Sequence, residues 1–378
     1  MKSILKKKRF LFGLIAVIVL ALFAFGGEQE ADVGEEAEEE EEVSYVVMPE
    51  NPVKMTGETI SVYNWGDYIE PEVIDVFEAE TGIRVIYETF ETNEDMYAKI
   101  AMGGSSYDVI IPSDYMIERM IQEQLLQPIN WENVPNVKNI DPRFTHESYD
   151  PAFAYSVPYT WGTMGVLYNK ETVLEEPDSW NVLLDETYKM DMFMLNAPRD
   201  TMAIALVMAG YDLNSTEPEE LQAAKELLIA QKPLVLAYVV DEVKDKMISG
   251  EASVALVWRG DATFCMSENE ELGYVVPKEG SNIFYDSMCI PHNARNVSGA
   301  EKFIDFMCRA DVAAANYNYV GYAIPNAAAI EVWGAEEYNA SPVNNPPQEA
   351  LDKCQVFRYL GDDTKLYDQI WTEIISEF

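Results

Sequence analysis

Residues 59–90 read TISVYNWGDYIEPEVIDVFEAETGIRVIYETF, and this stretch decides the fold class. The segment Thr59–Trp65 alternates polar and apolar side chains, which predicts a β-strand. Pro71 then opens an amphipathic helix that closes at Gly82. Ile83–Phe90 is again strand-like. A strand, a helix and a second strand in this order predict a parallel βαβ unit.

The same alternation continues along the chain. About 320 residues follow the low-complexity start, which is long for one core and comfortable for two. We therefore predict an α/β protein of two lobes, each built on a mainly parallel sheet with helices on both faces. The further predicted strands are Tyr107–Ile111, Met192–Leu195, Leu234–Val240 and Val254–Trp258. The further predicted helices are Glu94–Met102, Met116–Leu126, Thr201–Gly210, Pro218–Gln231, Glu242–Ile248 and Ala300–Asn316.

The first 56 residues differ from the rest. A basic stretch at residues 2–9 precedes an apolar run at 10–25, which predicts a signal peptide or an N-terminal membrane anchor over residues 1–27. The basic end then lies in the cytoplasm and the remainder outside it. No cysteine for lipidation follows the run, and Phe23 and Phe25 make a poor cleavage site, so both alternatives stay open. Ten of the fifteen residues in Glu28–Glu42 are acidic, so residues 28–56 are predicted to be an acidic linker without fixed structure.

The charge and composition exclude several functions. The formal net charge is −40, from 66 acidic and 26 basic residues, which repels nucleic acid and gives no attraction to anionic lipid. The charge concentrates cations, although it also serves solubility alone. Four cysteines without a CxxC pair and two histidines offer little for a metal site. No glycine-rich phosphate loop with a following lysine is present, and no cofactor is expected.

Most of the predicted strand ends carry an aromatic ring and an acid. Ligands of open parallel sheets bind beyond the carboxyl ends of the strands. A ring face attracts a cation by roughly 0.5–2 kcal/mol, and a carboxylate adds a charge-assisted hydrogen bond to an ammonium group. The pattern predicts a site for an aliphatic amine. Its candidate residues are Trp65, Asp67, Tyr68, Tyr115, Asp200, Trp258, Asp261, Phe284, Tyr285 and Asp286.

Each of these residues also has an ordinary structural explanation. Aromatic rings at strand ends are often packing residues, and Asp67 and Asp114 fit the roles of turn or cap residues. Asp286 is the strongest candidate, because it stands between Phe284-Tyr285 and an apolar stretch, Met288–Ile290. A carboxylate in such a place is expected to be buried, and a buried acid needs a partner.

Several motifs resemble the bacterial spermidine/putrescine-binding proteins of ABC importers. The matching stretches are Val62–Ile69, Glu91–Lys99, Tyr107–Ser113, Val157–Thr163, Val276–Gly280, Ile283–Ser287 and Gly321–Asn326. The resemblance implies a two-lobed periplasmic-binding-protein type II fold with a ligand cleft between the lobes. Lobe 1 is expected to comprise residues 57–165, completed by about 287–330, and lobe 2 residues 166–286, completed by about 331–378.

The resemblance also implies roles for individual residues. Asp286 is expected to hold an amine, while Trp65 and Trp258 flank the alkyl chain. Ala197 stands where the spermidine-preferring branch has a second acid, and the family's glutamine does not align cleanly with Gln355. The family's contact positions fall on Trp65, Tyr68, Ser113, Tyr115, Trp258, Phe284, Asp286 and Tyr322, with further acids at Asp200, Asp67 and Asp261.

The function implied is a non-catalytic, extracytoplasmic protein that delivers putrescine or spermidine to the permease subunits of an ABC transporter. It meets the membrane only through the N-terminal segment. One alternative is a binding protein for a ferric ion, a sugar or an amino acid, whose carboxylate Arg199 or Arg259 would hold. Another is a glycan hydrolase with paired carboxylates, although no acid pair with separated pKa values is identifiable.

Overall fold

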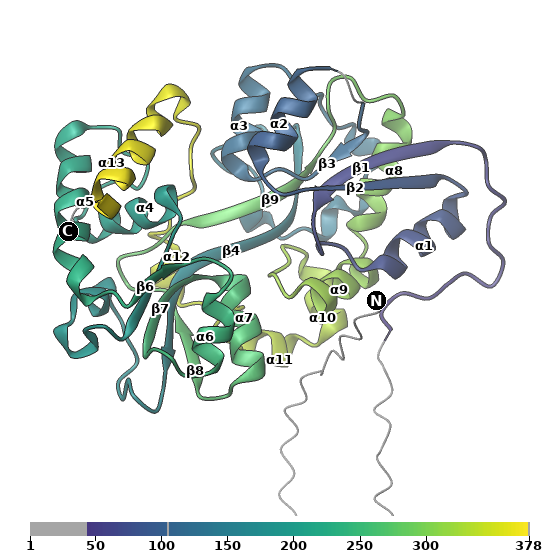
Figure 1. Ribbon diagram of the computed structural model, residues 1–378. Helices are drawn as coiled ribbons and strands as arrows, with labels where there is room; N and C mark the ends of the chain where they lie inside the picture. Colours follow the sequence, from purple (N-terminus) through teal and green to yellow (C-terminus); the bar gives the residue numbers. More distant parts are fainter. Residues whose placement is uncertain (1–43, 104–105, 377–378) are drawn as a thin grey trace, which may run out of the picture. The chain divides into compact units, whose positions relative to one another are not determined.

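The computed structural model describes residues 44–103 and 106–376. The predicted βαβ unit is confirmed as strand β1 (Thr59–Trp65), helix α1 (Pro71–Thr81) and strand β2 (Arg84–Phe90). The two strands pair in parallel (Figure 1). Pro71 occupies the first turn of α1, and Gly82 ends the helix in a left-handed conformation with φ of 69°.

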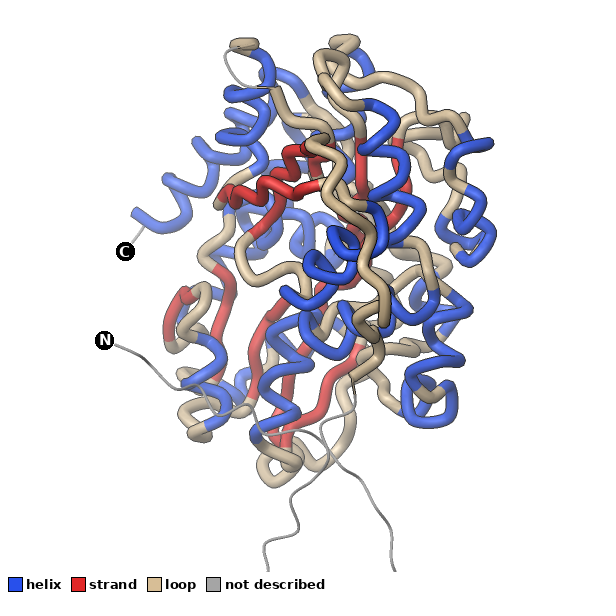
Figure 2. Tube along the Cα trace, turned by 90° about the vertical axis from the view of Figure 1, so that its right-hand side faces the viewer, coloured by secondary structure: helices blue, strands red, loops and turns tan. Residues whose placement is uncertain are grey.

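In the described part of the chain, nine strands pair in the order β2-β1-β3-β9-β4-β7-β5-β6, and β8 pairs with β4. Helices run along both sides of these strands (Figure 2). The remaining strands are β3 (Val109–Ile110), β4 (Ser156–Asn169), β5 (Met192–Leu195), β6 (Ala237–Val239), β7 (Val254–Trp258), β8 (Leu272–Val275) and β9 (Ile283–Cys289). The remaining helices are α2 (Asn93–Ala101), α3 (Asp114–Gln122), α4 (Pro198–Met208), α5 (Pro218–Gln231), α6 (Val243–Ile248), α7 (Arg259–Glu268), α8 (Val297–Met307), α9 (Ala310–Val320), α10 (Ala327–Trp333), α11 (Ala335–Ala340), α12 (Gln348–Leu351) and α13 (Thr364–Ser376).

Two bodies pack around separate cores. The largest core draws its buried side chains from residues 46–161 and 285–323. Other cores gather buried side chains from residues 164–276 and 343–374. We call the first body lobe 1 and the second lobe 2, and this division agrees with the predicted two-lobed α/β class.

Strand β4 joins the two lobes. Its residues 156–163 pair with β9 in lobe 1, and its residues 164–169 pair with β7 and β8 in lobe 2. Figure 1 shows β4 and β9 running side by side. All fourteen residues of β4 are buried. Such a fully buried strand carries no alternating pattern, which is why sequence periodicity did not identify it.

The prediction of a mainly parallel sheet is wrong at the centre. β4 and β9 are antiparallel to their neighbours, and parallel pairing is confined to β1, β2 and β3 in lobe 1 and to β5, β6 and β7 in lobe 2. A strand that carries the chain from one lobe to the other has no crossover helix, so it is not bound to run parallel to its neighbours.

Two local expectations also differ from the structure. The predicted helix Ala300–Asn316 is two helices, α8 and α9, because Arg309 adopts an extended conformation between them. Residues 44–56 are not the free linker that was expected. Val46 is buried in the core of lobe 1, and the amide of Val53 donates to the carbonyl of Ala79 at 2.7 Å.

The predicted signal peptide or anchor, residues 1–27, and the linker up to residue 43 lie outside the described residues. Among the residues that are described, no helix combines the length and the apolar character needed to cross a membrane.

Candidate functional site

The site is built around the carboxylate of Asp286 on β9, which is 6% exposed. One oxygen, Oδ2, accepts a hydrogen bond from the hydroxyl of Tyr68 at 2.6 Å and a longer one from Thr160 at 3.4 Å. The other oxygen, Oδ1, accepts from the hydroxyl of Ser113 at 2.7 Å. Burial raises the pKa of Asp286, and these three hydroxyl groups offset part of the rise.

Three strands bring these side chains together. Ser113 follows β3 and forms an antiparallel bridge with Asp286. Thr160 lies on β4 directly opposite Asp286, and Tyr68 follows the end of β1. β3 and β4 flank β9 in the sheet, so residues that are more than a hundred positions apart in sequence meet at one carboxylate.

The Asp286 carboxylate lacks a cationic partner within the described residues, where no lysine, arginine or histidine lies within ion-pair distance of it. Burying an ionised carboxylate costs several kcal/mol unless a counter-charge or enough donors compensate. Three neutral hydroxyl groups compensate only in part. The site is therefore suited to a cation that arrives from outside the protein.

Aromatic rings cluster next to Asp286. The ring of Tyr68 lies 5.6 Å from that of Tyr322, edge to face, and the ring of Phe284 lies 6.2 Å from Tyr322. Tyr322, from lobe 1, lies against Gly260 at the start of α7 in lobe 2, where a methyl group would overlap its ring. Glycine at this position is what allows the two lobes to approach each other so closely.

Tyr285 is separated from the other candidates. Successive side chains of a strand point to opposite faces, so Phe284 and Asp286 share one face of β9 and Tyr285 takes the other. Its ring packs in the core of lobe 1 near Tyr149 and Phe144.

Lobe 2 contributes an indole and two acids. The Nε1 of Trp258, at the end of β7, donates to Asp200 Oδ1 at 3.1 Å. Burial raises the pKa of Asp200, and this hydrogen bond and the charge of Arg199 lower it in part. Asp261, in the first turn of α7, lies 3.6 Å from the Nζ of Lys244. Burial raises the pKa of Asp261 to about 6, against the attraction of Lys244.

The remaining candidates lie at the edges of this cluster. Tyr115 packs against the cores of both lobes, and its hydroxyl donates to Glu94 at 3.0 Å. The ring of Trp65 lies 4.4 Å from Phe90, and its buried Nε1 has no hydrogen-bond partner among the described residues. Asp67 is exposed with φ of 50°, which is the geometry of a turn residue.

The two arginines considered for a carboxylate ligand are already engaged. Arg259 is fully buried, and it donates to the carbonyl of Val343 and to the side chain of Asn344. Arg199 donates to Asn214 and to the carbonyl of Arg358. Both of these Arg199 bonds use Nη2, and its buried Nε has no hydrogen-bond partner in the described part of the chain.

Sequence reasoning missed two supporting residues. Thr160 reaches Asp286, and Asn93 donates to the hydroxyl groups of both Ser113 and Tyr115. Thr160 stands in the Val157–Thr163 motif, but only the strand register shows that it faces Asp286.

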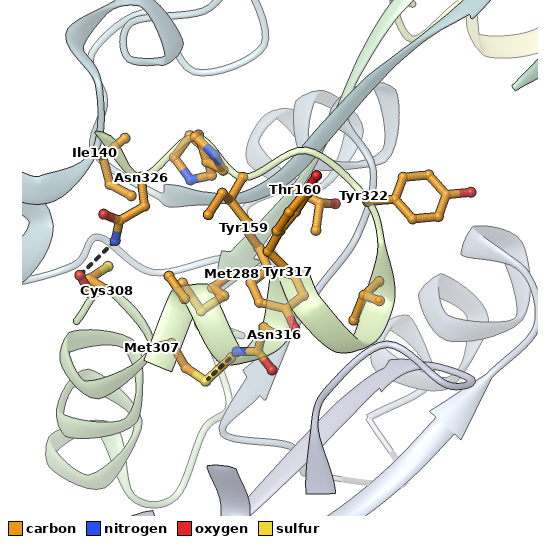
Figure 3. Close-up of a pocket in the computed structure, with 15 residues that line it drawn as sticks. Ile140, Tyr159, Thr160, Met288, Met307, Cys308, Asn316, Tyr317, Tyr322 and Asn326 are labelled. Carbon is orange, nitrogen blue, oxygen red and sulfur yellow. Dashed lines mark hydrogen bonds between the residues drawn. The ribbon is translucent and has the colours of Figure 1, made fainter. Parts of the chain in front are cut away.

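A separate small cavity lies inside lobe 1, between β4 and helices α8 and α9 (Figure 3). Its volume of about 10 Å³ is at the limit for one water molecule, so it is not a ligand site. Tyr322 borders this cavity, and its hydroxyl points away from it in Figure 3. Within residues 44–103 and 106–376, no group of three or more His, Cys, Asp or Glu is arranged to hold a metal ion.

Two lobes joined by crossing strands, with polar and aromatic side chains gathered at their junction, define a solute-binding protein. The chain belongs to the family of bacterial extracellular solute-binding proteins, whose family model matches residues 72–345. This membership agrees with the predicted location outside the cytoplasm.

Individual relatives within this family are polyamine-binding proteins. A spermidine/putrescine-binding periplasmic protein of Salmonella typhimurium is 34% identical over 319 residues, covering 84% of this chain and 91% of the relative. The putrescine-binding periplasmic protein PotF of Escherichia coli is 30% identical, with 84% and 91% covered. The solved structure of the spermidine/putrescine ABC transporter substrate-binding protein PotD from Streptococcus pneumoniae is similar, with a TM-score of 0.79, 38% identity, and 84% and 98% covered. These relatives are binding and transport proteins, which supports the reading of a non-catalytic protein.

The raised pKa of Asp261 predicts how stability depends on pH. The folded state holds the proton up to about pH 6, while the unfolded state releases it near about pH 3.9. The contribution of Asp261 to the free energy of unfolding is therefore full below about pH 4 and is lost as the pH rises through about 6. Relative to Asp261→Asn, the wild type should lose on the order of 3 kcal/mol of stability across this range. Urea unfolding of both proteins at several pH values measures it, and a constant difference would contradict the prediction.

Proposed function

We propose that this protein binds a polyamine, putrescine or spermidine, at the junction of its lobes and delivers it to the permease of an ABC transporter. The observation that carries the proposal is the Asp286 carboxylate, which is buried and bonded only by hydroxyl groups. An ammonium group supplies the missing positive charge and up to three donors. The names of the spermidine- and putrescine-binding relatives support the same ligand class.

The aromatic rings suit the rest of such a ligand. Tyr68, Tyr322 and Phe284 offer ring faces and apolar walls for methylene groups next to Asp286. On the side of lobe 2, we propose Trp258 and Asp200, which share a hydrogen bond, as contacts for the far end of the ligand. We propose ligand-contact roles for Trp65, Asp67, Tyr115 and Asp261 at the periphery of the site. For Tyr285 we propose a packing role, in which its ring holds β9 against the core of lobe 1.

Arg259 offers little to an anionic ligand, because it is fully buried and bonded within the protein. We further propose that residues 57–165 with 287–330, and residues 166–286 with 331–378, close as two bodies over the ligand. Strands β4 and β9 connect them.

The central test replaces the charge of Asp286. Asp286→Asn keeps the size of the side chain and removes the anion, so the affinity for putrescine or spermidine should fall at least about a hundredfold. Isothermal titration calorimetry measures the change. Asp368→Asn, on the exposed face of α13, is the matched control and should bind like the wild type. An Asp286→Asn protein with wild-type affinity, or a wild type that binds no polyamine, would refute the proposal.

The affinity should also depend on pH. Burial raises the pKa values of Asp286 and Asp200, so both carboxyl groups take up protons at a higher pH than usual. An ammonium ligand needs them ionised, so the affinity should fall as the pH is lowered below neutral, and binding should release protons. Calorimetry at several pH values, in buffers of different ionisation enthalpy, measures both effects. An affinity that stays constant or rises toward acidic pH is the opposite result.

We also propose that residues 1–27 export the chain as a signal peptide or hold it as an N-terminal anchor, with the acidic residues 28–43 as a spacer. Residues 44–56 dock on lobe 1, so a tether would leave lobe 2 free to move. Fractionation of cells and N-terminal sequencing test this. We expect the protein outside the cytoplasm, beginning at residue 1 if anchored and near residue 28 if cleaved, whereas an intact cytoplasmic chain would contradict it.

A further inference from the structure

Glu118, in the middle of α3, is an acid whose hydrogen-bond partners come from a distant part of the chain. Its carboxylate accepts hydrogen bonds from the Nε of Arg358 at 3.0 Å on both oxygens, and from the backbone amide of Tyr359 at 2.8 Å. The Nη2 of Arg358 also donates to it. The Glu118 side chain is 10% exposed, whereas that of Arg358 is 46% exposed.

The two partners belong to different lobes. α3 is fixed in lobe 1 by Met116, Ile117 and Met120, which are buried in its core. Arg358 follows Phe357, which is buried in a core of lobe 2.

The backbone of Arg358 is itself held in lobe 2. Its amide donates to Asn214 at 2.8 Å, and its carbonyl accepts from Arg199 at 3.1 Å. The Glu118–Arg358 ion pair therefore spans the junction from one rigid attachment to another.

A second contact reinforces this pair. The guanidinium group of Arg119 stacks over the ring of Tyr97 at 3.6 Å in lobe 1, and it lies 5.1 Å from the ring of Tyr359 in lobe 2. Glu123 keeps Arg119 in place at 3.0 Å. A cation between two rings adds attraction across the same rim of the junction.

We propose that Glu118 and Arg358 form an interlobe clasp that holds the protein closed over its ligand and so sets the affinity and the rate of release. The inference rests on the proposed function. Helix α3 connects the ligand site with the ion pair. Ser113, at the N-cap position of α3, donates to Asp286, and Glu118 lies about one and a half turns further along the helix. A contact made only in the closed state shifts the population toward that state, and ligand affinity rises by the same factor.

The unequal burial of the partners makes the clasp testable. In an open protein Glu118 returns to water, but in the closed protein it is buried and depends on donors from lobe 2. Arg358→Met therefore leaves, in the closed state alone, a buried carboxylate without a counter-charge and with only the amide of Tyr359 as a donor. Glu118→Gln leaves an arginine that is nearly half exposed and stays hydrated. Loss of the arginine should weaken closure more than loss of the acid.

The experiment compares polyamine binding by full-length wild type, Arg358→Met, Glu118→Gln and the double variant, using calorimetry for affinity and stopped-flow fluorescence for dissociation. We expect Arg358→Met to bind about thirtyfold more weakly, mainly through faster dissociation, and Glu118→Gln about threefold to tenfold more weakly. The double variant should bind no more weakly than Arg358→Met, because it has no stranded charge. Glu373→Gln, which breaks an ion pair with Lys225 inside lobe 2, is the control and should bind like the wild type.

Two outcomes would overturn the clasp: Arg358→Met with wild-type affinity and dissociation rate, or losses of the single variants that simply add in the double variant. If Arg358→Met does not fold, Arg358→Lys can replace it. This variant keeps the positive charge but loses the two-pronged guanidinium contact, so its affinity for polyamine should fall less than that of Arg358→Met. Small-angle X-ray scattering of the ligand-free proteins separates this inference from the proposed function. Arg358→Met should be more extended than the wild type whether or not a polyamine binds, and an unchanged scattering profile would count against the clasp.

Discussion

The central feature of the structure is the carboxylate of Asp286, which is buried and has no cationic partner among the described residues. Asp286 lies on the strand between β3 and β4, and hydroxyl groups from three other segments point at it. Hydroxyl groups can donate to a carboxylate, yet they leave its charge in place. The charge of Asp286 is therefore left without a cationic partner in the part of the chain that the structure describes, and the proposed cation site rests on this property.

The strands at the junction of the lobes explain how Asp286 comes to be buried among hydroxyl groups. β4 and β9 cross the junction next to each other, so the side chains at the junction are held by strands and not by flexible loops. Phe284 and Asp286 follow from the alternation of one strand, and Trp258 and Asp200 come from the neighbouring sheet of lobe 2. Under the proposed function, a ligand that touches both groups would interact with both lobes, and its binding would favour the closed state.

Charge is distributed unevenly between the site and its rim. At the centre, acids stand with aromatic rings and neutral donors. At the rim, Glu118 forms an ion pair with Arg358, and Asp261 forms one with Lys244. Glu118 and Asp261 thus have cationic partners inside the protein, whereas Asp286 has none within residues 44–103 and 106–376.

Much of this could be read from the residues in order, because it depends on local periodicity. The strands at Thr59–Trp65 and Val254–Trp258, the helix at Pro218–Gln231, and the prominence of Asp286 all follow from spacing, capping residues and apolar neighbours. Other features depend on contacts between distant residues, and no local pattern encodes those. Only the tertiary structure showed the antiparallel crossing of β4, the turn of Tyr285 into the core, the hydroxyl of Thr160 on Asp286, and the Glu118–Arg358 pair, because pairing register and packing decide which side chains meet.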